Sequence, residues 1–291
     1  MTYSDNENTR VWLITGASSG LGYEFTKKAL ESGDKVVAIA RNIEKLNELK
    51  SQFEGRLLPL RLDVTNRSAV FSAVETAITH FGKLDIVINN AGNMVLGMIE
   101  EFSEDEVRSQ METNYYGAVW VCQAVLPHLR TQGSGHIIQI SSIGGLITGP
   151  MSGVYSASKF ALEGFSEALA QEAAHFGIKV SIIEPGGYWT NLYLKMGLTA
   201  QKKEYDLLRE ELAKQNSTKS ADSDPKLAAE AMMKLVNSDN PPLRLILGSL
   251  VYDLAIDHTE KRISTWKEWE AVSRSAEFAI PAPEGYGSME E

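Results

Sequence analysis

The sequence predicts an α/β protein: a doubly wound, Rossmann-like parallel sheet flanked by helices on both faces, in a single domain with a C-terminal helical extension. Short apolar runs rich in β-branched residues alternate along the chain with longer segments of helical period. The runs are nearly continuous in hydrophobicity, as expected for strands buried on both faces. This alternation implies right-handed βαβ units and therefore a parallel sheet with helices on both sides.

Each element is expected where one of the two patterns begins. The β-branched apolar runs predict strands at Val11–Thr15, Lys35–Ala40, Leu57–Leu62, Asp85–Asn89, His136–Ser141, Lys179–Ile183 and Leu243–Leu247. The segments of helical period predict helices that begin near Gly20, Ile43, Arg67, Ser103, Thr113, Val154 and Lys226. Together these elements place the sheet domain at residues 10–250.

Two segments do not follow the alternation. Residues 186–224 come after the sixth strand and have no strand character, so we expect a lid over the site, with a disordered loop as the alternative. Residues 251–291 are expected to form the C-terminal helical extension, which contains Pro281 and Pro283 near an acidic end.

Composition narrows the class of protein. Apolar residues make up 43% of the 291 residues and charged residues 23%, which is ordinary for a globular protein. The net charge of −10 argues against nucleic acid and against an anionic membrane surface as partners. The first ten residues are polar, and no apolar run approaches the ~18 residues of a membrane span. The cytoplasm is therefore the expected location.

Several reactive or charged side chains are expected to have structural roles. Cys122, the single cysteine, lies among apolar residues and is expected to be a buried thiol in a helix, in a reducing compartment. The five histidines are scattered without ligand spacing, so no metal site is expected. Glu100, Glu101 and the acidic run at 104–106 are expected to form the solvated start of a helix.

A glycine-rich turn follows the first strand and leads into a helix. Its sequence is Thr15-Gly16-Ala17-Ser18-Ser19-Gly20-Leu21-Gly22, with the spacing GxxxGxG in place of GxGxxG. Such glycines permit a tight turn and a close approach of the backbone to a pyrophosphate. The helix N-terminus attracts the same group through its unpaired N–H groups and its dipole. A purely structural turn is the alternative.

The end of the second strand indicates which cofactor is bound. An acid about 20 residues after the last glycine would bind the ribose hydroxyls of NAD. This chain has no acid there and carries Arg41, whose planar guanidinium suits a 2′-phosphate. NADP(H) is the expected cofactor, and a solvated arginine at a strand end is the alternative.

A tyrosine and a lysine lie four residues apart on a predicted helix, in Tyr155-Ser156-Ala157-Ser158-Lys159. Residues at this spacing share a helix face. An unperturbed phenol titrates near ~10, which is too high for efficient proton transfer at neutral pH, and a neighbouring cation lowers that value. Taken alone, however, YxxxK also occurs on many surface helices.

Residues 10–250 resemble the short-chain dehydrogenase/reductase family, with its motifs in order and spacing. The glycine turn matches TGxxxGxG, and Tyr155 with Lys159 matches YxxxK. The other matches are Asp63 after the third strand, Asn89-Asn90-Ala91-Gly92 for NNAG, Asn114 for NxxG, Ser142 before the tyrosine, and Pro185 to Thr190 for PGxxxT.

The resemblance implies four catalytic residues. Tyr155 would give the proton to the carbonyl oxygen, or remove it from the alcohol. Lys159 would hold the nicotinamide ribose and lower the pKa of Tyr155. Ser142 would donate a hydrogen bond to the substrate oxygen, with Ser141 as the alternative. Asn114 would hold a water that links Lys159 to solvent, or serve mainly as a helix kink.

The resemblance also implies the two binding surfaces. The expected cofactor contacts are Gly16, Ser18, Ser19, Gly20, Leu21, Arg41, Asp63, Val64, Asn90, Ala91, Gly92, Tyr155, Lys159, Pro185, Gly186 and Thr190. A finer resemblance, in residues 186–190 and 241–248, is to the diverse 17β-hydroxysteroid-dehydrogenase-like branch, which names no substrate. The expected apolar substrate pocket consists of Met94, Ser142, Leu146, Met151, Tyr188, Trp189, Tyr193 and Met196. Packing of the lid against its own domain is the alternative for its residues.

The expected activity is NADP(H)-dependent hydride transfer that reduces a small-molecule substrate, a hydrophobic ketone or aldehyde. The alternatives are a cofactor-binding regulatory protein without turnover, and an epimerase or dehydratase on the same fold. The resemblance further implies a homodimer or homotetramer assembled through the helices at Thr113–Arg130 and Val154–His175.

Overall fold

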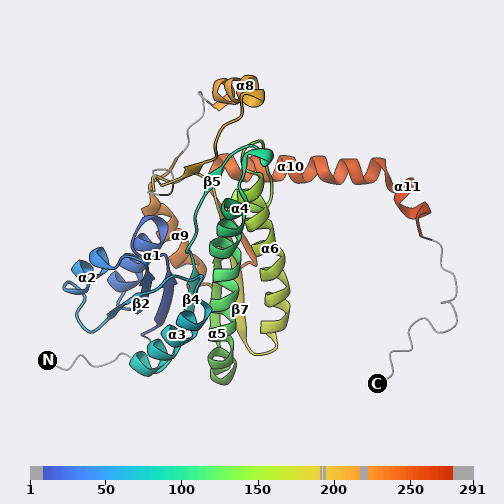
Figure 1. The fold of residues 1–291 in the computed structure, drawn as a ribbon. Helices are drawn as coiled ribbons and strands as arrows, with labels where there is room; N and C mark the ends of the chain where they lie inside the picture. Colours follow the sequence, from blue (N-terminus) through green and yellow to red (C-terminus); the bar gives the residue numbers. More distant parts are fainter. Residues whose placement is uncertain (1–8, 191, 193–194, 217–221, 278–291) are drawn as a thin grey trace, which may run out of the picture. The chain divides into compact units, whose positions relative to one another are not determined.

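The computed structural model describes residues 9–190, 192, 195–216 and 222–277. The chain divides into two compact units, Met1–Tyr252 and Asp253–Glu291. The first unit contains a seven-stranded sheet in the order β3-β2-β1-β4-β6-β7-β9, and every neighbouring pair in it is parallel (Figure 1). The predicted fold class is confirmed.

Every predicted strand and helix of the sheet domain is present. The strands are β1 (Val11–Thr15), β2 (Lys35–Ala40), β3 (Leu57–Arg61), β4 (Ile86–Asn89), β6 (Gly135–Ile140), β7 (Ile178–Pro185) and β9 (Arg244–Leu247). The helices are α1 (Gly20–Glu31), α2 (Glu44–Lys50), α3 (Arg67–Phe81), α4 (Glu104–Met111), α5 (Gly117–Gln132), α6 (Gly153–Ala174) and α9 (Pro225–Val236).

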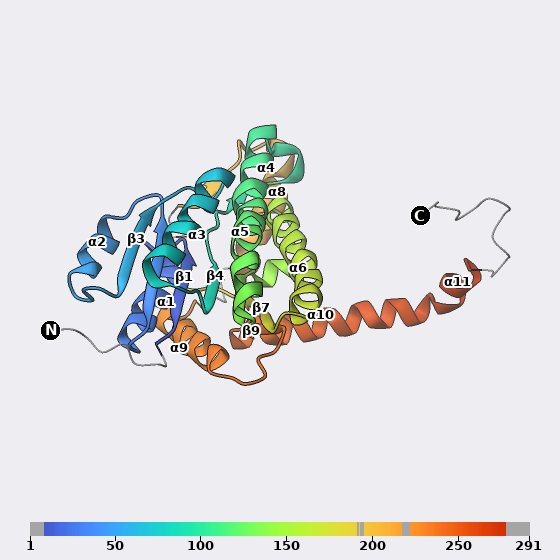
Figure 2. The ribbon, with the colours of Figure 1, turned by 90° about the horizontal axis from the view of Figure 1, so that it is seen from below.

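Two apolar cores lie on opposite faces of the sheet. Successive strand residues point to opposite faces, so Trp12 and Ile14 of β1 join one core while Val11 and Leu13 join the other. Helices α1, α2 and α9 contribute to the first core, and α3, α5 and α6 to the second (Figures 1 and 2). Because both faces are covered, the strands are apolar along their whole length.

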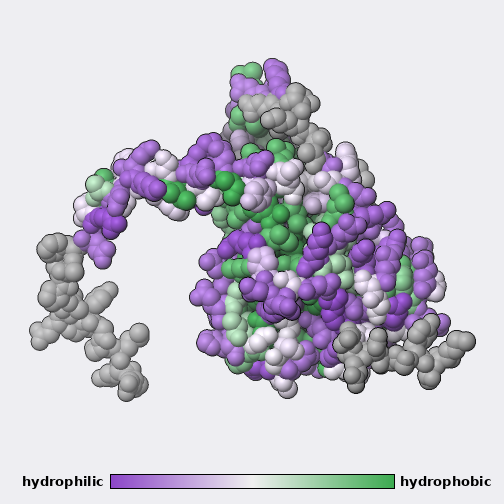
Figure 3. Space-filling view, turned by 180° about the vertical axis from the view of Figure 1, so that it is seen from behind, coloured by the Kyte–Doolittle hydropathy of each residue, from purple (hydrophilic) through white to green (hydrophobic). Residues whose placement is uncertain are grey.

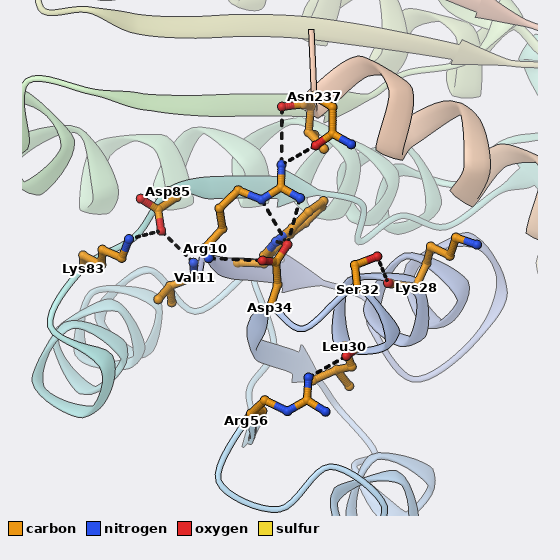
Figure 4. Close-up of polar contacts among 12 residues, drawn as sticks. Arg10, Val11, Lys28, Leu30, Ser32, Asp34, Arg56, Lys83, Asp85 and Asn237 are labelled. Atoms are coloured by element: carbon orange, nitrogen blue, oxygen red, sulfur yellow. Dashed lines mark hydrogen bonds and ion pairs between the residues drawn. The ribbon is translucent and has the colours of Figure 1, made fainter. Parts of the chain in front are cut away.

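The amino ends of the first strands are fixed by polar contacts (Figure 4). The Asp34 carboxylate accepts hydrogen bonds from the backbone and side chain of Arg10 and from the Trp12 indole, at 2.8–3.1 Å. Arg10 also donates to Asn237, just after α9, at 2.7 Å. Asp85 accepts from the Val11 amide at 2.7 Å. The polar side chains at this edge of the sheet therefore have structural roles.

The segment expected to be a strandless lid, residues 186–224, contains regular structure. It includes a short strand, β8 (Gly197–Leu198), and a helix, α8 (Asp206–Asn216). Strand β8 pairs in parallel with β5 (Val95–Leu96), which follows β4. The expectation of no strand character is wrong. A two-residue strand is too short to show an alternating pattern, and its partner lies about 100 residues away.

The C-terminal helices were expected from residue 251 onward. Helix α10 spans Ser249–Glu268, so it begins in the first unit and continues in the second, and α11 (Glu270–Ser275) follows it. Pro281 and Pro283 lie outside the described residues. None of the described helices is long and apolar enough to cross a lipid bilayer. In the face of the first unit drawn in Figure 3, hydrophobic residues gather near the middle, and hydrophilic residues lie around them.

Candidate active site

A cavity of about 400 Å³ lies at the carboxyl ends of the central strands. Strand β1 pairs with β2 on one side and with β4 on the other, so the strand order reverses at this point. Open α/β sheets bind ligands at such a reversal, because the connections on its two sides lead to opposite faces and leave a crevice. The lining includes every residue that was expected to contact the cofactor: Gly16, Ser18, Ser19, Gly20, Leu21, Arg41, Asp63, Val64, Asn90, Ala91, Gly92, Tyr155, Lys159, Pro185, Gly186 and Thr190.

The glycine turn has little room for a side chain at its three glycine positions. Gly16 and Gly20 have positive φ angles of 65° and 55°, which favour glycine. A Cβ on Gly22 would lie 2.4 Å from Asn90 Nδ2 and 2.5 Å from the Gly16 carbonyl oxygen. Ser19, which precedes α1, makes no side-chain capping bond to that helix. The first turn of α1 therefore presents backbone N–H groups to the cavity, as a diphosphate requires.

Polar contacts between β1 and β4 hold this turn in place. The Thr15 hydroxyl accepts hydrogen bonds from the amides of Asn90 and Ala91, both at 3.0 Å. The Asn90 side chain donates back to the carbonyl oxygens of Thr15 and Gly16, at 2.9 and 3.2 Å. Asn90 thus supports the backbone of the turn directly. On the other side, Gly20 faces the side chain of Thr190. These residues fit a dinucleotide with its diphosphate at the start of α1.

The end of the cavity beside β2 carries Arg41. Its side chain is exposed and follows directly after the strand. The neighbouring Asn42 accepts a hydrogen bond from the amide of Glu44, the first residue of α2, at 2.9 Å. Asp63 accepts from the amide and hydroxyl of Thr65, at 3.1 and 2.9 Å. Asp63 is the only acid among the described lining residues, so the ribose end of the cavity offers one cation and one anion.

The structure brings together three of the four expected catalytic residues. Ser142, Tyr155 and Lys159 all line the cavity. Gly144 lies between the first two: a Cβ there would be 3.1 Å from the Tyr155 ring and 3.4 Å from Ser142 Oγ. Ser142 Oγ also accepts a hydrogen bond from the Gly144 amide at 3.0 Å, which fixes its direction. Lys159 Nζ lies 5.9 Å from the centre of the Tyr155 ring.

Lys159 is a buried amine with a perturbed pKa. Its Nζ donates a hydrogen bond to the Ile140 carbonyl oxygen at 2.9 Å. Burial lowers the pKa of Lys159 to about 8, and the charge of Glu163, one helical turn further along α6, opposes this shift. A buried titratable amine at the edge of a cavity, beside a phenol, is typical of a catalytic site.

Asn114 does not line the cavity. Its side chain donates to the Asn93 carbonyl oxygen and the Ser158 hydroxyl, both at 3.0 Å, and accepts from the Asn93 amide at 2.8 Å. It lies within a π-helical turn, Glu112–Tyr116, that delays the start of α5 to Gly117. The backbone hydrogen-bond pattern changes from α-helical to π-helical at this turn. This asparagine also fixes the loop after β4 beside Lys159.

The expected substrate pocket is only partly assembled. Met94, Ser142 and Tyr188 line the cavity, whereas Leu146, Met151, Trp189 and Met196 are absent from its described lining, and Tyr193 lies outside the described residues. Trp189 is 66% exposed. Tyr188 forms an isolated bridge with Ser223 and packs against the core at the edge of the cavity. Trp189 therefore does not contribute to the described lining of the cavity, and its place in a substrate pocket stays a prediction.

Other residues of this region were not predicted from the sequence. Asn93 and Lys195 line the cavity although no motif marks them. Glu101, expected at a solvated helix start, is instead 7% exposed, because the segment around β8 covers it. Its neighbour Glu100 is exposed as expected. The partners of Glu101 come from a remote segment, so no local signal could have revealed them.

The structure describes no alternative reactive centre. Cys122 is buried, as predicted, and accepts hydrogen bonds from Asn89 and Gln139. Burial raises the pKa of this thiol to about 12, so it is not a nucleophile. Among the described residues no cluster of three or more histidine, cysteine or acidic side chains is placed to hold a metal ion.

Comparison with known proteins identifies the family. The model of the short chain dehydrogenase family matches residues 10–200. An oxidoreductase named BOA17 from Botryotinia fuckeliana is 38% identical over 91% of this chain and 98% of its own length. A 3-ketodihydrosphingosine reductase from Bacteroides thetaiotaomicron is 40% identical over 83% of this chain and 89% of its own.

Solved structures agree with this assignment. A short-chain dehydrogenase from Streptomyces avermitilis superposes with a TM-score of 0.87 and 36% identity, covering 94% of this chain and all of that one. A serine dehydrogenase complexed with NADP⁺ gives a TM-score of 0.71 and 27% identity, covering 82% and 95%. The chain therefore belongs to the short-chain dehydrogenase/reductase family and is an oxidoreductase of that family.

Proposed function

We propose that the protein is an NADP(H)-dependent reductase that converts a hydrophobic ketone or aldehyde into an alcohol. The observation that carries this proposal is the convergence of Ser142, Tyr155 and Lys159 on the same cavity that the glycine turn and Arg41 line. That arrangement supports a site in which a proton donor, a cation and a hydroxyl act beside a bound dinucleotide.

The three side chains have different roles in the reaction at the substrate oxygen. Tyr155 donates its proton to the carbonyl oxygen as negative charge develops there. Lys159 stabilises the resulting phenolate by its charge and hydrogen-bonds the ribose. Ser142, oriented by the Gly144 amide, donates a second hydrogen bond to the same oxygen. The bound nicotinamide supplies the hydride.

One observation supports NADP(H) over NAD(H). Arg41 follows β2 directly, where a 2′-phosphate would lie, and no acid occupies that position. Arg41→Ala should therefore reduce the preference for NADPH over NADH, because only the phosphorylated cofactor loses an ionic partner.

The character of the substrate follows from the other end of the cavity. Met94, Tyr188 and Leu192 present apolar or aromatic surface there. The similar reductase from Bacteroides thetaiotaomicron is named for 3-ketodihydrosphingosine, which supports a ketone as the substrate of this chain. The exposed aromatic residues of α6 and of the π-helical turn support a homodimer or homotetramer.

The decisive experiment replaces Tyr155 with phenylalanine. NADPH oxidation would be followed by absorbance with a panel of aliphatic and aromatic ketones, for the wild type and for Tyr155→Phe. We expect kcat to fall by at least a factor of about 10² to 10⁴, since general acid catalysis contributes that much. NADPH binding, measured by fluorescence titration, should change less than twofold.

The alternatives give different results in the same experiment. A cofactor-binding regulatory protein would bind NADPH but oxidise it with none of the ketones. An epimerase or dehydratase would convert a sugar nucleotide without net oxidation of NADPH. Normal turnover by Tyr155→Phe would show that the proton comes from another group.

A further inference from the structure

Glu101 is a buried carboxylate that binds groups from three segments. It ends the short helical turn Ile99–Glu101 between β5 and α4, and its side chain has no exposed surface. One oxygen accepts a hydrogen bond from the Met98 amide at 2.9 Å and from the Thr199 hydroxyl at 3.1 Å. The other accepts from the Lys202 amide at 2.8 Å and forms an ion pair with Arg209.

Arg209 closes the same set of contacts from α8. Its side chain is only 13% exposed, and it donates to the Lys202 carbonyl oxygen and to Asp206, both at 2.9 Å. Burial favours the neutral form of Glu101, but hydrogen bonds from Lys202 and Met98, then Thr199 and the charge of Arg209, hold the pKa of Glu101 below its usual value. The carboxylate is therefore ionised at neutral pH.

These contacts reinforce a ladder that begins at the cavity wall. The Gly197 amide donates to the carbonyl oxygen of Met94, and the Thr199 amide to that of Leu96, both at 3.0 Å. A Cβ on Gly97 would lie 1.9 Å from the Thr199 hydroxyl, so the two segments touch backbone to side chain. Met94 and Lys195, which precede the two strands, both line the cavity.

We propose that Glu101 is a positioning residue that holds segment 197–209 on the loop after β4 and thereby fixes the substrate end of the cavity. Glu101 is not among the described lining residues of the cavity, so it acts through Met94 and Lys195, which are. The kinetic part of this proposal rests on the proposed reductase function. Since the anchor lies at the substrate end, its loss should affect large substrates and leave the cofactor site unchanged.

The test uses Glu101→Gln, which keeps the shape and one acceptor oxygen but removes the charge. We expect KM for long hydrophobic ketones to rise about tenfold, because a charged buried hydrogen-bond network is lost. KM for acetone, kcat and the dissociation constant of NADPH should change less than twofold. Arg209→Gln should behave like Glu101→Gln, and Arg209→Lys should restore much of the wild-type KM.

Glu100→Gln is the matched control. Glu100 is the preceding residue and its carboxylate forms an ion pair with the side chain of Lys202 at 3.0 Å, but it is about half exposed. Exposed pairs contribute little, so this variant should have wild-type kinetics. An equal effect of Glu100→Gln would show that surface charge, and not the buried anchor, controls the segment.

Hydrogen exchange tests the anchor without any turnover. Backbone amides of residues 197–203 should exchange about tenfold faster in Glu101→Gln than in the wild type or Glu100→Gln, with the rest of the sheet unchanged. Unchanged exchange there would overturn the proposal. So would faster exchange with an unchanged KM, or a parallel loss of NADPH affinity, which would indicate general destabilisation. If the wild type reduces no ketone, the proposed function fails while exchange still decides whether Glu101 anchors the segment.

Discussion

Glu184 of β7 is a fully buried carboxyl group whose surroundings favour the protonated form. Burial, and then the charge of Glu163, raises the pKa of Glu184 from 4.5 to about 7. Arg244 Nε lies 3.5 Å from Glu184 Oε1 and opposes this shift, but it also binds Glu163 at 3.1 Å. The guanidinium of Arg244 thus interacts with two buried carboxyl groups, those of Glu163 and Glu184.

This pKa predicts how stability depends on pH. A carboxyl group with a raised pKa in the folded state stabilises the fold fully below pH 4.5 and loses that contribution as pH rises through about 7. The span from 4.5 to about 7 corresponds to about 3 kcal/mol. Glu184→Gln should therefore be more stable than the wild type at pH 8, by about 1–3 kcal/mol, and similar at pH 5. Urea unfolding at both pH values measures this difference.

Glu167→Gln is the control for this prediction. Glu167 binds the same Arg244 at 3.1 Å, but its side chain is 54% exposed. Its loss should leave the pH dependence of unfolding unchanged. A stability difference between Glu184→Gln and the wild type that is the same at pH 5 and pH 8 would contradict the assigned ionisation of Glu184.

Single residues were predictable where the chemistry lies in a local motif. Arg41 follows a strand, and Tyr155 and Lys159 share a helix turn. Spacing alone left each of them with a structural alternative, and the resemblance to the family assigned them to one site. Glu101 and Glu184 carry no such signal, since burial and partners decide their roles. The partners of Glu101 lie about 100 residues away, at Thr199, Lys202 and Arg209.

At the scale of elements, the glycine turn and α1 act as one unit with the loop after β4. Gly22→Ala would place a methyl group 2.4 Å from Asn90 Nδ2 and 2.5 Å from a backbone oxygen of the same turn. We expect a loss of about 1–3 kcal/mol in stability, typical of overpacking. NADPH affinity should fall at least about tenfold, because the crowded turn would move away from the diphosphate. A tenfold loss corresponds to about 1.4 kcal/mol of binding free energy.

Gly164→Ala in α6 provides the comparison. A Cβ at Gly164 would meet nothing within 4 Å, and helical glycine is about 1 kcal/mol less favourable than alanine. This variant should be neutral or slightly stabilised, with unchanged NADPH binding. Thermal unfolding and fluorescence titration of both variants separate crowding at the turn from a general effect of added methyl groups.

A helix or strand could be predicted from the sequence when its own segment shows a periodic hydrophobic pattern. The strands and helices of the sheet are long enough to show a pattern within one segment. The sequence predicts the start of α5 near Thr113, four residues before Gly117, and the π-helical turn at Glu112–Tyr116 occupies the residues between. Strands β5 and β8 exist only through pairing with each other, which a sequence pattern does not record.

At the scale of the whole molecule, the proposed assembly depends on an exposed aromatic surface. Tyr116 of the π-helical turn is 38% exposed and stacks on Trp120 of α5, with ring centres 5.8 Å apart. Phe160 of α6 is 40% exposed. Helices α5 and α6 run side by side, and Tyr115 contacts Phe165 between them (Figures 1 and 2). Aromatic residues of this kind are enriched in interfaces.

Phe160→Glu should therefore convert the predicted homodimer or homotetramer into a smaller species. A buried unpaired charge in an interface costs several kcal/mol, so the apparent dissociation constant should rise by at least about a hundredfold. Light scattering after size exclusion measures the mass. Leu207→Glu is the control, because Leu207 of α8 is 76% exposed and lies on a different element. An unchanged mass for Phe160→Glu, or a monomeric wild type, would contradict assembly through α6. A charge at position 160 changes the mass only if Phe160 contacts a second copy of the chain.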